Sequence, residues 1–153
     1  MDRPPAHGKG RPQGRPFFAS VGGLAPLRMR RHVGLMASEP AWFAALVAQC
    51  WSAASASTYS ADNPSCGQCS VAALVAQDWL GGDLFKTPAG GGWHWYNMIY
   101  ERRFDFTADQ FAARLDYRDV PSTRADAFTD ASVEQYRALS DAVRALAQGS
   151  GRK

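Results

Sequence analysis

The spacing of hydrophobic residues predicts three longer helices. The first begins after Ser38, a favourable N-cap, and apolar side chains recur at helical intervals through residues 38–50. A second helix is predicted at residues 69–80, and it ends at Gly81-Gly82 because glycine accepts the left-handed conformation of a helix C-cap. The third is predicted at residues 132–146, where apolar side chains again lie three or four positions apart.

Between the second and third helices the pattern changes to the alternation that is typical of half-buried strands. A short helix is predicted from Thr107 to Leu115, before a loop that contains Pro121. This order of elements predicts an α+β fold, in which N- and C-terminal helices accompany a small antiparallel sheet. The strands are predicted at residues 83–87, 93–99 and 104–107, and the turns between them at 88–92 and 100–103.

The first 35 residues differ in composition from the rest of the chain. They carry seven Lys or Arg and one Asp, for a net charge of +6, whereas the remainder carries ten and thirteen, for −3. Such a Pro-, Gly- and Arg-rich segment predicts a disordered tail, or a true start at Met36. We therefore expect a tail at 1–35, one globular domain at 36–147 and a frayed end at 148–153. Because the excess positive charge lies in the tail, it predicts no specific nucleic-acid binding.

The three cysteines are too few, and odd in number, for a disulfide scaffold. Cys66 and Cys69 have CxxC spacing, but the chain lacks a second pair or neighbouring histidines to complete a zinc site. No metal and no cofactor is therefore expected, and reduced cysteines indicate a cytoplasmic protein. No apolar run approaches the roughly 20 residues of a membrane span.

The most distinctive chemistry is predicted around Cys69. It directly follows Gly67-Gln68 and opens a helix, where free amide N–H groups and the helix dipole favour a thiolate. The same amides could receive an oxyanion, and Gln68 could orient a substrate. The alternative for Cys69 is a cysteine that only packs in the core.

A thiolate nucleophile needs a base, and the base needs a residue that orients it. His94 and Asp105 lie on successive predicted strands, and alternation places them on the same face if the aromatic residues between them face the core. A turn through Glu101 then requires a bulge or a diagonal contact between the two. Asn97 is an alternative polar partner, and Trp93 could line a substrate groove. A hydrogen-bonded core histidine and a turn-capping aspartate are the competing interpretations.

Several ordered motifs resemble the bacterial family called YunG-like, over residues 51–111 and more loosely over 136–143. The turn between His94 and Asp105 is about one residue shorter than in the family pattern. The motifs are Asn63-Pro64-Ser65, Gly67-Gln68-Cys69, Ala73-Leu74-Val75, Gln77-Asp78, Gly81-Gly82-Asp83, His94-Trp95-Tyr96-Asn97, Phe104-Asp105-Phe106-Thr107 and Gln110-Phe111.

The order of the three residues also resembles papain-like and NlpC/P60-like folds, in which a cysteine opens a helix and a histidine follows on a strand. That analogy implies acyl transfer on an amide or thioester of a small molecule or peptide, with Cys69 as nucleophile, His94 as proton shuttle and Asp105 as its orienter. A non-catalytic binding domain on the same scaffold is the alternative. A nucleic-acid or membrane adaptor would depend on the tail alone.

Overall fold

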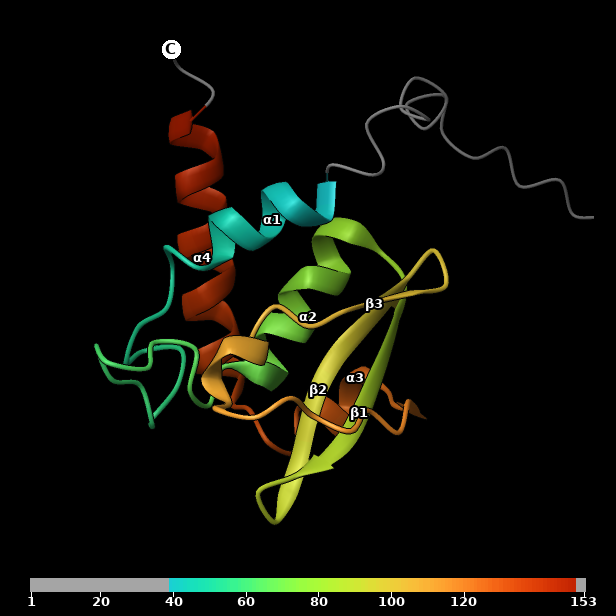
Figure 1. The fold of residues 1–153 in the computed structure, drawn as a ribbon. Coiled ribbons are helices and arrows are strands. Elements are labelled where there is room, and N and C mark those ends of the chain that lie inside the picture. Colours follow the sequence, from blue (N-terminus) through green and yellow to red (C-terminus); the bar gives the residue numbers. More distant parts are fainter. Residues whose placement is uncertain (1–38, 151–153) are drawn as a thin grey trace, which may run out of the picture. The chain divides into compact units, whose positions relative to one another are not determined.

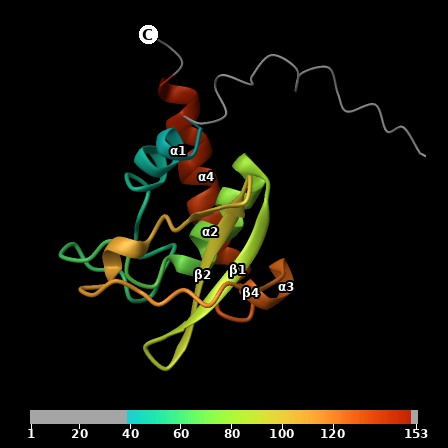
Figure 2. The ribbon, with the colours of Figure 1, turned by 45° about the vertical axis from the view of Figure 1, so that its right-hand side comes forward.

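Helix α2 (Cys69–Leu80) lies between the sheet on one side and helices α1 and α4 on the other (Figures 1 and 2). The computed structural model describes residues 39–150, which belong to one compact unit. The predicted tail at 1–35, the N-cap Ser38 and residues 151–153 lie outside the described residues. The α+β class is confirmed.

The first two turns of α2 are buried because the sheet packs on one side of the helix and α1 and α4 on the other. The eight residues from Cys69 to Ala76 are all buried. The helix ends where predicted: Gly81 and Gly82 have φ angles of 73° and 78°, and the Gly81 N–H donates to the carbonyl oxygen of Gln77 at 2.9 Å. These angles are unfavourable for residues with a Cβ, so the glycine pair determines the end of the helix.

Helix α1 (Glu39–Val47) is shorter than predicted, because its last turn tightens: the Cys50 N–H donates to Val47 three positions back. Trp42, an apolar position of the predicted helix, is 47% exposed and contacts Trp79, with ring centroids 5.9 Å apart. The main core joins α1 to α2 and α4 through the buried side chains of Phe43, Leu46, Val47, Cys50, Val71, Val75, Leu139 and Val143.

Helix α4 (Val133–Ser150) begins with a reciprocal cap. The Gln135 N–H donates to Ser132 Oγ at 3.1 Å, and the Ser132 N–H donates to Gln135 Oε1 at 2.9 Å. The helix also continues further than predicted, since residues 148–150 are helical rather than frayed. Ser150 Oγ donates to the carbonyl oxygen of Leu146 at 3.0 Å, which supports this extra turn.

The four strands form an antiparallel sheet in the order β3-β2-β1-β4. The first turn is narrower than predicted, because only Gly90 and Gly91 connect β1 to β2, both with positive φ. Among the described residues no helix is both long and apolar enough to cross a membrane. The strands are β1 (Asp83–Ala89), β2 (Gly92–Ile99), β3 (Arg102–Phe104) and β4 (Val120–Pro121).

The second hairpin corrects two predictions. Tyr100 and Glu101 alone form its turn, with φ angles of 51° and 59°, and Asn97 pairs with Phe104. The third strand therefore starts at Arg102 and ends at Phe104, two and three residues earlier than predicted. It ends there because the Asp105 carboxylate accepts the Thr107 N–H at 3.1 Å and bends the chain.

The predicted helix from Thr107 to Leu115 is also wrong. Only a 3₁₀ turn forms, η2 (Ala108–Gln110), and Phe111 after it is extended. The Gln110 side chain donates to the Thr107 carbonyl oxygen at 3.0 Å, so a side chain satisfies one of the groups that a longer helix would use. A short helix, α3 (Arg124–Ala127), follows β4 and begins at a Thr123 cap.

Candidate functional site

Cys69 is the first residue of α2 and is 7% exposed. The side chain of Gln68, the N-cap residue, makes no capping hydrogen bond. It instead donates to the carbonyl oxygens of Ser52 at 3.2 Å and Pro64 at 3.5 Å, within the preceding loop. The N–H groups of the first turn therefore lack a side-chain cap, and they favour negative charge beside the thiol.

Gly67 permits the close approach of the turn before Cys69 to Thr58. Its φ angle is +73°, and a Cβ at this position would lie 2.0 Å from Thr58 Oγ1. That hydroxyl donates to the Cys66 carbonyl oxygen at 3.3 Å, so it is held against the turn. A side chain at position 67 would therefore strain the backbone and displace Thr58.

The structure brings His94 and Asp105 together. His94 Nε2 lies 2.7 Å from Asp105 Oδ2, and their side chains are 2% and 5% exposed. The register explains the contact: continuing the pairs beyond Phe104 would place Asp105 opposite Tyr96, on the face that also carries His94. The two residues form a diagonal pair, which a two-residue turn makes available without a bulge.

The Asp105 carboxylate receives four hydrogen bonds. In addition to His94, Oδ2 accepts from the Tyr117 hydroxyl at 2.7 Å, while Oδ1 accepts from the Thr107 N–H at 3.1 Å and from Thr107 Oγ1 at 3.3 Å. Burial alone would raise the pKa of Asp105, but the hydrogen bonds and the charge of His94, with the Tyr117 and Thr107 donors, hold it below its usual value. The carboxylate is therefore ionised at neutral pH.

An ionised Asp105 determines how His94 carries its protons. Nε2 must donate to the carboxylate, so Nδ1 is the ring nitrogen that remains to interact with the Cys69 thiol. Burial alone would lower the pKa of His94, but the hydrogen bond to Asp105 and the influence of Cys69 raise it to about 9. Nδ1 completes no hydrogen bond with the described residues, so the contact to Cys69 is loose. Loose contacts between catalytic groups are common in proteins without substrate.

Two segments hold the thiol side and the carboxylate side of this site together. Asn63 Nδ2 donates to the Gln110 carbonyl oxygen at 3.1 Å, and the Gly67 N–H lies 3.4 Å from Gln110 Oε1. The Phe111 ring packs against His94 in a T-shaped contact, with centroids 4.8 Å apart and an interplanar angle of 86°. The loop before α2 and the η2 segment therefore form one cover over the imidazole.

Comparison with known proteins identifies the family. A model of the family described as YunG protein matches residues 39–148, well over half of the chain. The chain belongs to the YunG family. It is 46% identical over 97 residues to a Bacillus subtilis (strain 168) protein named "Uncharacterized protein YunG". The aligned region covers 63% of this chain and 84% of the relative. No solved structure gives a significant match.

Five of the YunG-like motifs meet at one place in the fold. Cys69, His94 and Asp105 form its centre, and the motifs that contain Asn63 and Gln110 supply the contacts between its two sides. Within residues 39–150 no group of three or more His, Cys, Asp or Glu side chains is arranged to hold a metal ion.

Two other predicted site residues lie apart from this centre. Asn97 is fully buried on the opposite face of β2, where its Nδ2 donates to the Ala73 carbonyl oxygen of α2 at 2.9 Å. It therefore fastens α2 to the sheet and does not contact His94. Trp93, at the start of β2, is 43% exposed, and the Lys86 ammonium lies 4.3 Å from its ring centroid. Trp93 is thus a surface residue, not a core one.

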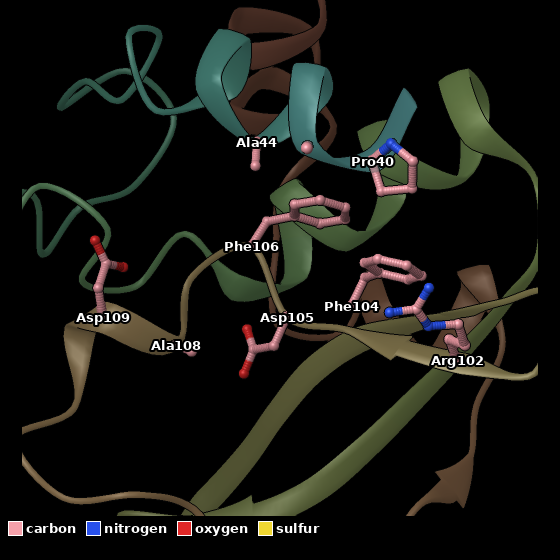
Figure 3. Close-up of a pocket in the computed structure, with 9 residues that line it drawn as sticks. Pro40, Ala44, Arg102, Phe104, Asp105, Phe106, Ala108 and Asp109 are labelled. Carbon is pink, nitrogen blue, oxygen red and sulfur yellow. The ribbon is translucent and has the colours of Figure 1, made fainter. Parts of the chain in front are cut away.

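A pocket of about 520 Å³ lies behind Asp105 (Figure 3). The rings of Phe104 and Phe106 point toward Pro40 and Ala44 of α1, while the Asp105 carboxylate points away from them. Neither Cys69 nor His94 lines this space. The pocket therefore adjoins the back of the candidate site and does not open onto the thiol.

Sequence reasoning missed Tyr117. Its hydroxyl contacts Asp105 although the residue lies in an irregular segment that carries no periodic signal. Phe111 was part of a recognised motif, but nothing in that motif indicated a contact with the imidazole. Both contacts depend on how the chain returns across the sheet after β3, which local patterns do not specify.

Proposed function

We propose that this protein is a cysteine hydrolase or acyltransferase, with Cys69 as nucleophile, His94 as proton shuttle and Asp105 as the residue that orients it. The observation that carries the proposal is the buried hydrogen bond of 2.7 Å between His94 and Asp105, next to a cysteine at a helix N-terminus. The arrangement is papain-like in this proposal, since a helix bearing the cysteine packs on an antiparallel sheet bearing the histidine.

The substrate class that suits these groups is an amide or thioester. The Cys69 sulfur attacks the carbonyl carbon, and the carbonyl oxygen becomes an oxyanion near the N–H groups of the first turn of α2. Protonated His94 gives its proton to the leaving nitrogen or sulfur as that bond breaks. Water, or an acceptor amine or alcohol, then attacks the acyl-cysteine while His94 removes its proton, and the thiol group is regenerated.

In this proposal Gln68 and Gly67 shape the site. The Gln68 amide already donates to two loop carbonyls, so the oxyanion donors are backbone N–H groups, and Gln68 positions the turn that presents them. Gly67 provides space for that turn. Trp93 lies on the face of β2 that carries Trp95, away from His94, and has no role in this proposal.

The test compares thiols within one molecule. We expect iodoacetamide to label Cys69 rapidly at pH 6.5, and His94→Ala to slow this about a hundredfold, because an ordinary thiol is only about 1% ionised at that pH. Cys66, three residues away and partly exposed, is the internal control and should be unaffected. Site-resolved mass spectrometry gives both rates.

A second measurement addresses acyl transfer directly. Wild type treated with p-nitrophenyl acetate should release a burst of p-nitrophenol and carry the acetyl group on Cys69, and Cys69→Ser should show neither. If Cys69 labels no faster than Cys66, or if no acyl-cysteine forms, the enzyme proposal is wrong.

The alternative is a binding domain, and the burial of the site favours it. Cys69 is 7% and His94 only 1% exposed, so a substrate must displace part of the cover to reach the thiol. Unchanged fold and partner binding in Cys69→Ala, combined with an inert thiol, would support this second function.

A further inference from the structure

Among residues 39–150, Tyr117 is the one tyrosine whose hydroxyl donates a hydrogen bond to the Asp105 carboxylate. Its hydroxyl lies 2.7 Å from Asp105 Oδ2, the same oxygen that faces His94. The carboxylate is nearly buried, at 5% exposure, so water cannot readily replace this donor. A charge in such surroundings depends on the donors that the protein supplies.

The Tyr117 ring is held in place on several sides. The ring makes a T-shaped contact with the Tyr96 ring, with centroids 5.0 Å apart and an interplanar angle of 82°. The Arg103 guanidinium lies 4.3 Å from the Tyr117 centroid. Arg103 is itself fixed by a bidentate pair with Asp119, in which Nε lies 2.9 Å from Oδ1.

Asp119 completes the support. Its carboxylate accepts the Tyr96 hydroxyl at 2.9 Å, and its backbone N–H donates to that hydroxyl at 2.9 Å. Tyr96 and Tyr117 are thus neighbouring phenols with the same chemistry and different carboxylates. Only Tyr117 reaches Asp105, which makes Tyr96 a natural control.

We propose that Tyr117 is a positioning residue of the candidate active site, which keeps the Asp105 carboxylate ionised and aimed at His94. This inference depends on the proposed function for its role in catalysis, although the contact itself does not. Tyr117 acts through Asp105 and touches no substrate. The pKa of Tyr117 is raised by burial and by its hydrogen bond to Asp105, so the phenol stays protonated and able to donate.

Charged groups from β2, β3 and η2 lie near the contact between Tyr117 and Asp105. His94 of β2 faces Asp105 directly, and the Arg103 guanidinium of β3 lies over the Tyr117 ring. Arg102 and Asp109 line the pocket behind Asp105 (Figure 3). Removing the Tyr117 hydroxyl therefore leaves Thr107 and His94 as the donors to Asp105.

The experiment compares Tyr117→Phe with Tyr96→Phe and wild type in the full chain. Loss of a donor to a buried carboxylate should raise the Asp105 titration midpoint, followed by carbon NMR of its carboxyl group, by about one pH unit. The acid limb of Cys69 labelling should move upward by a similar amount, and Tyr96→Phe should change neither midpoint.

A purely structural role predicts a different result. Tyr117→Phe would then lower the urea midpoint while the Asp105 titration and the labelling profile stay at their wild-type positions, and this outcome would overturn the inference. Equal shifts in the two phenylalanine variants would also overturn it. If wild-type Cys69 shows no dependence on His94, the proposed function fails, but the Asp105 titration still decides whether Tyr117 controls the carboxylate.

Discussion

Both faces of β2 are buried, but different forces hold them. On the α2 face, Trp95 packs with apolar residues of α2 such as Leu74, and Asn97 adds one hydrogen bond to the Ala73 carbonyl oxygen. On the other face, His94 and Tyr96 lie under the segment that follows β3, and carboxylates accept their polar hydrogens. The first face is an apolar core, and the second is a polar network.

This difference indicates how stability and chemistry are divided. Apolar packing is non-directional and does not depend on pH, whereas a buried polar network depends on each partner and on its ionisation. The backbone follows the same division: within residues 39–150, the non-glycine residues with positive φ are Tyr100, Glu101 and Asp119, and all lie in the part of the chain from the second hairpin to β4. We therefore expect substitutions on the α2 face to change stability, and those on the polar face to change pH behaviour.

The largest effect is expected on the apolar face. Leu74 is fully buried, so Leu74→Ala should lower the free energy of unfolding by about 2–5 kcal/mol, as a cavity replaces its side chain. Urea unfolding measures this, with Val133→Ala, 45% exposed, as a control expected within about 0.5 kcal/mol of wild type. In native conditions the pH profile of Cys69 labelling should not move. A shifted pH profile of Cys69 labelling in Leu74→Ala would contradict the expectation that the α2 face controls stability alone.

A smaller effect is expected from the ionisation of the polar face. His94 has a folded pKa raised from 6.5 to about 9, so its contribution is complete below pH 6.5 and lost as the pH rises through 9. Asp105 has a lowered pKa, so its contribution is present above about pH 4 and lost as the pH falls through the folded value.

Between pH 6.5 and 9.5, wild type should therefore lose up to about 3 kcal/mol of unfolding free energy. His94→Gln removes the titrating group and should give a flatter curve over the same range. The measurement is urea unfolding at closely spaced pH values. Parallel curves for the two proteins would show that the His94–Asp105 pair does not couple to stability.

The smallest effect is expected at the turns of the two hairpins. Glu101 has φ 59° with a side chain, whereas Gly91 occupies the matching position in the other turn with φ 81°. Glu101→Gly should raise the free energy of unfolding by about 1 kcal/mol, and Gly91→Ala should lower it by about the same amount. A Cβ at Gly91 meets nothing within 4 Å, so strain alone accounts for the loss.

These two variants also test whether the strained turn matters for the site. The His94 titration, followed by NMR, should be unchanged in Gly91→Ala, because a Cβ there meets nothing within 4 Å and that turn does not lead into β3 and Asp105. In Glu101→Gly it should also be unchanged if the register of β3 persists. A lowered His94 pKa in Glu101→Gly would show that the turn residue itself keeps Asp105 in place.

Much of the fold was predictable where local chemistry decides it. Cys69 and Leu80 bound α2 as expected, because the apolar run and the following glycines are both local signals. The register of the second hairpin was not, since Tyr100 and Glu101 carry none of the usual turn signals and still adopt positive φ. The alternation of side chains nevertheless placed His94 and Asp105 on the same face, because the aromatic residues of each strand show which of its faces is apolar.

The sequence by itself determined the class of the fold, the position of Cys69 at a helix start and the pair of residues that could serve it, because helix caps and strand alternation are encoded over a few neighbouring residues. Only the tertiary structure decided that Asp105 is saturated by four hydrogen bonds, that Tyr117 is one of the donors and that Asn97 turns away to α2. These contacts join segments distant along the chain, and their geometry exists only once the sheet register and the returning loop are in place.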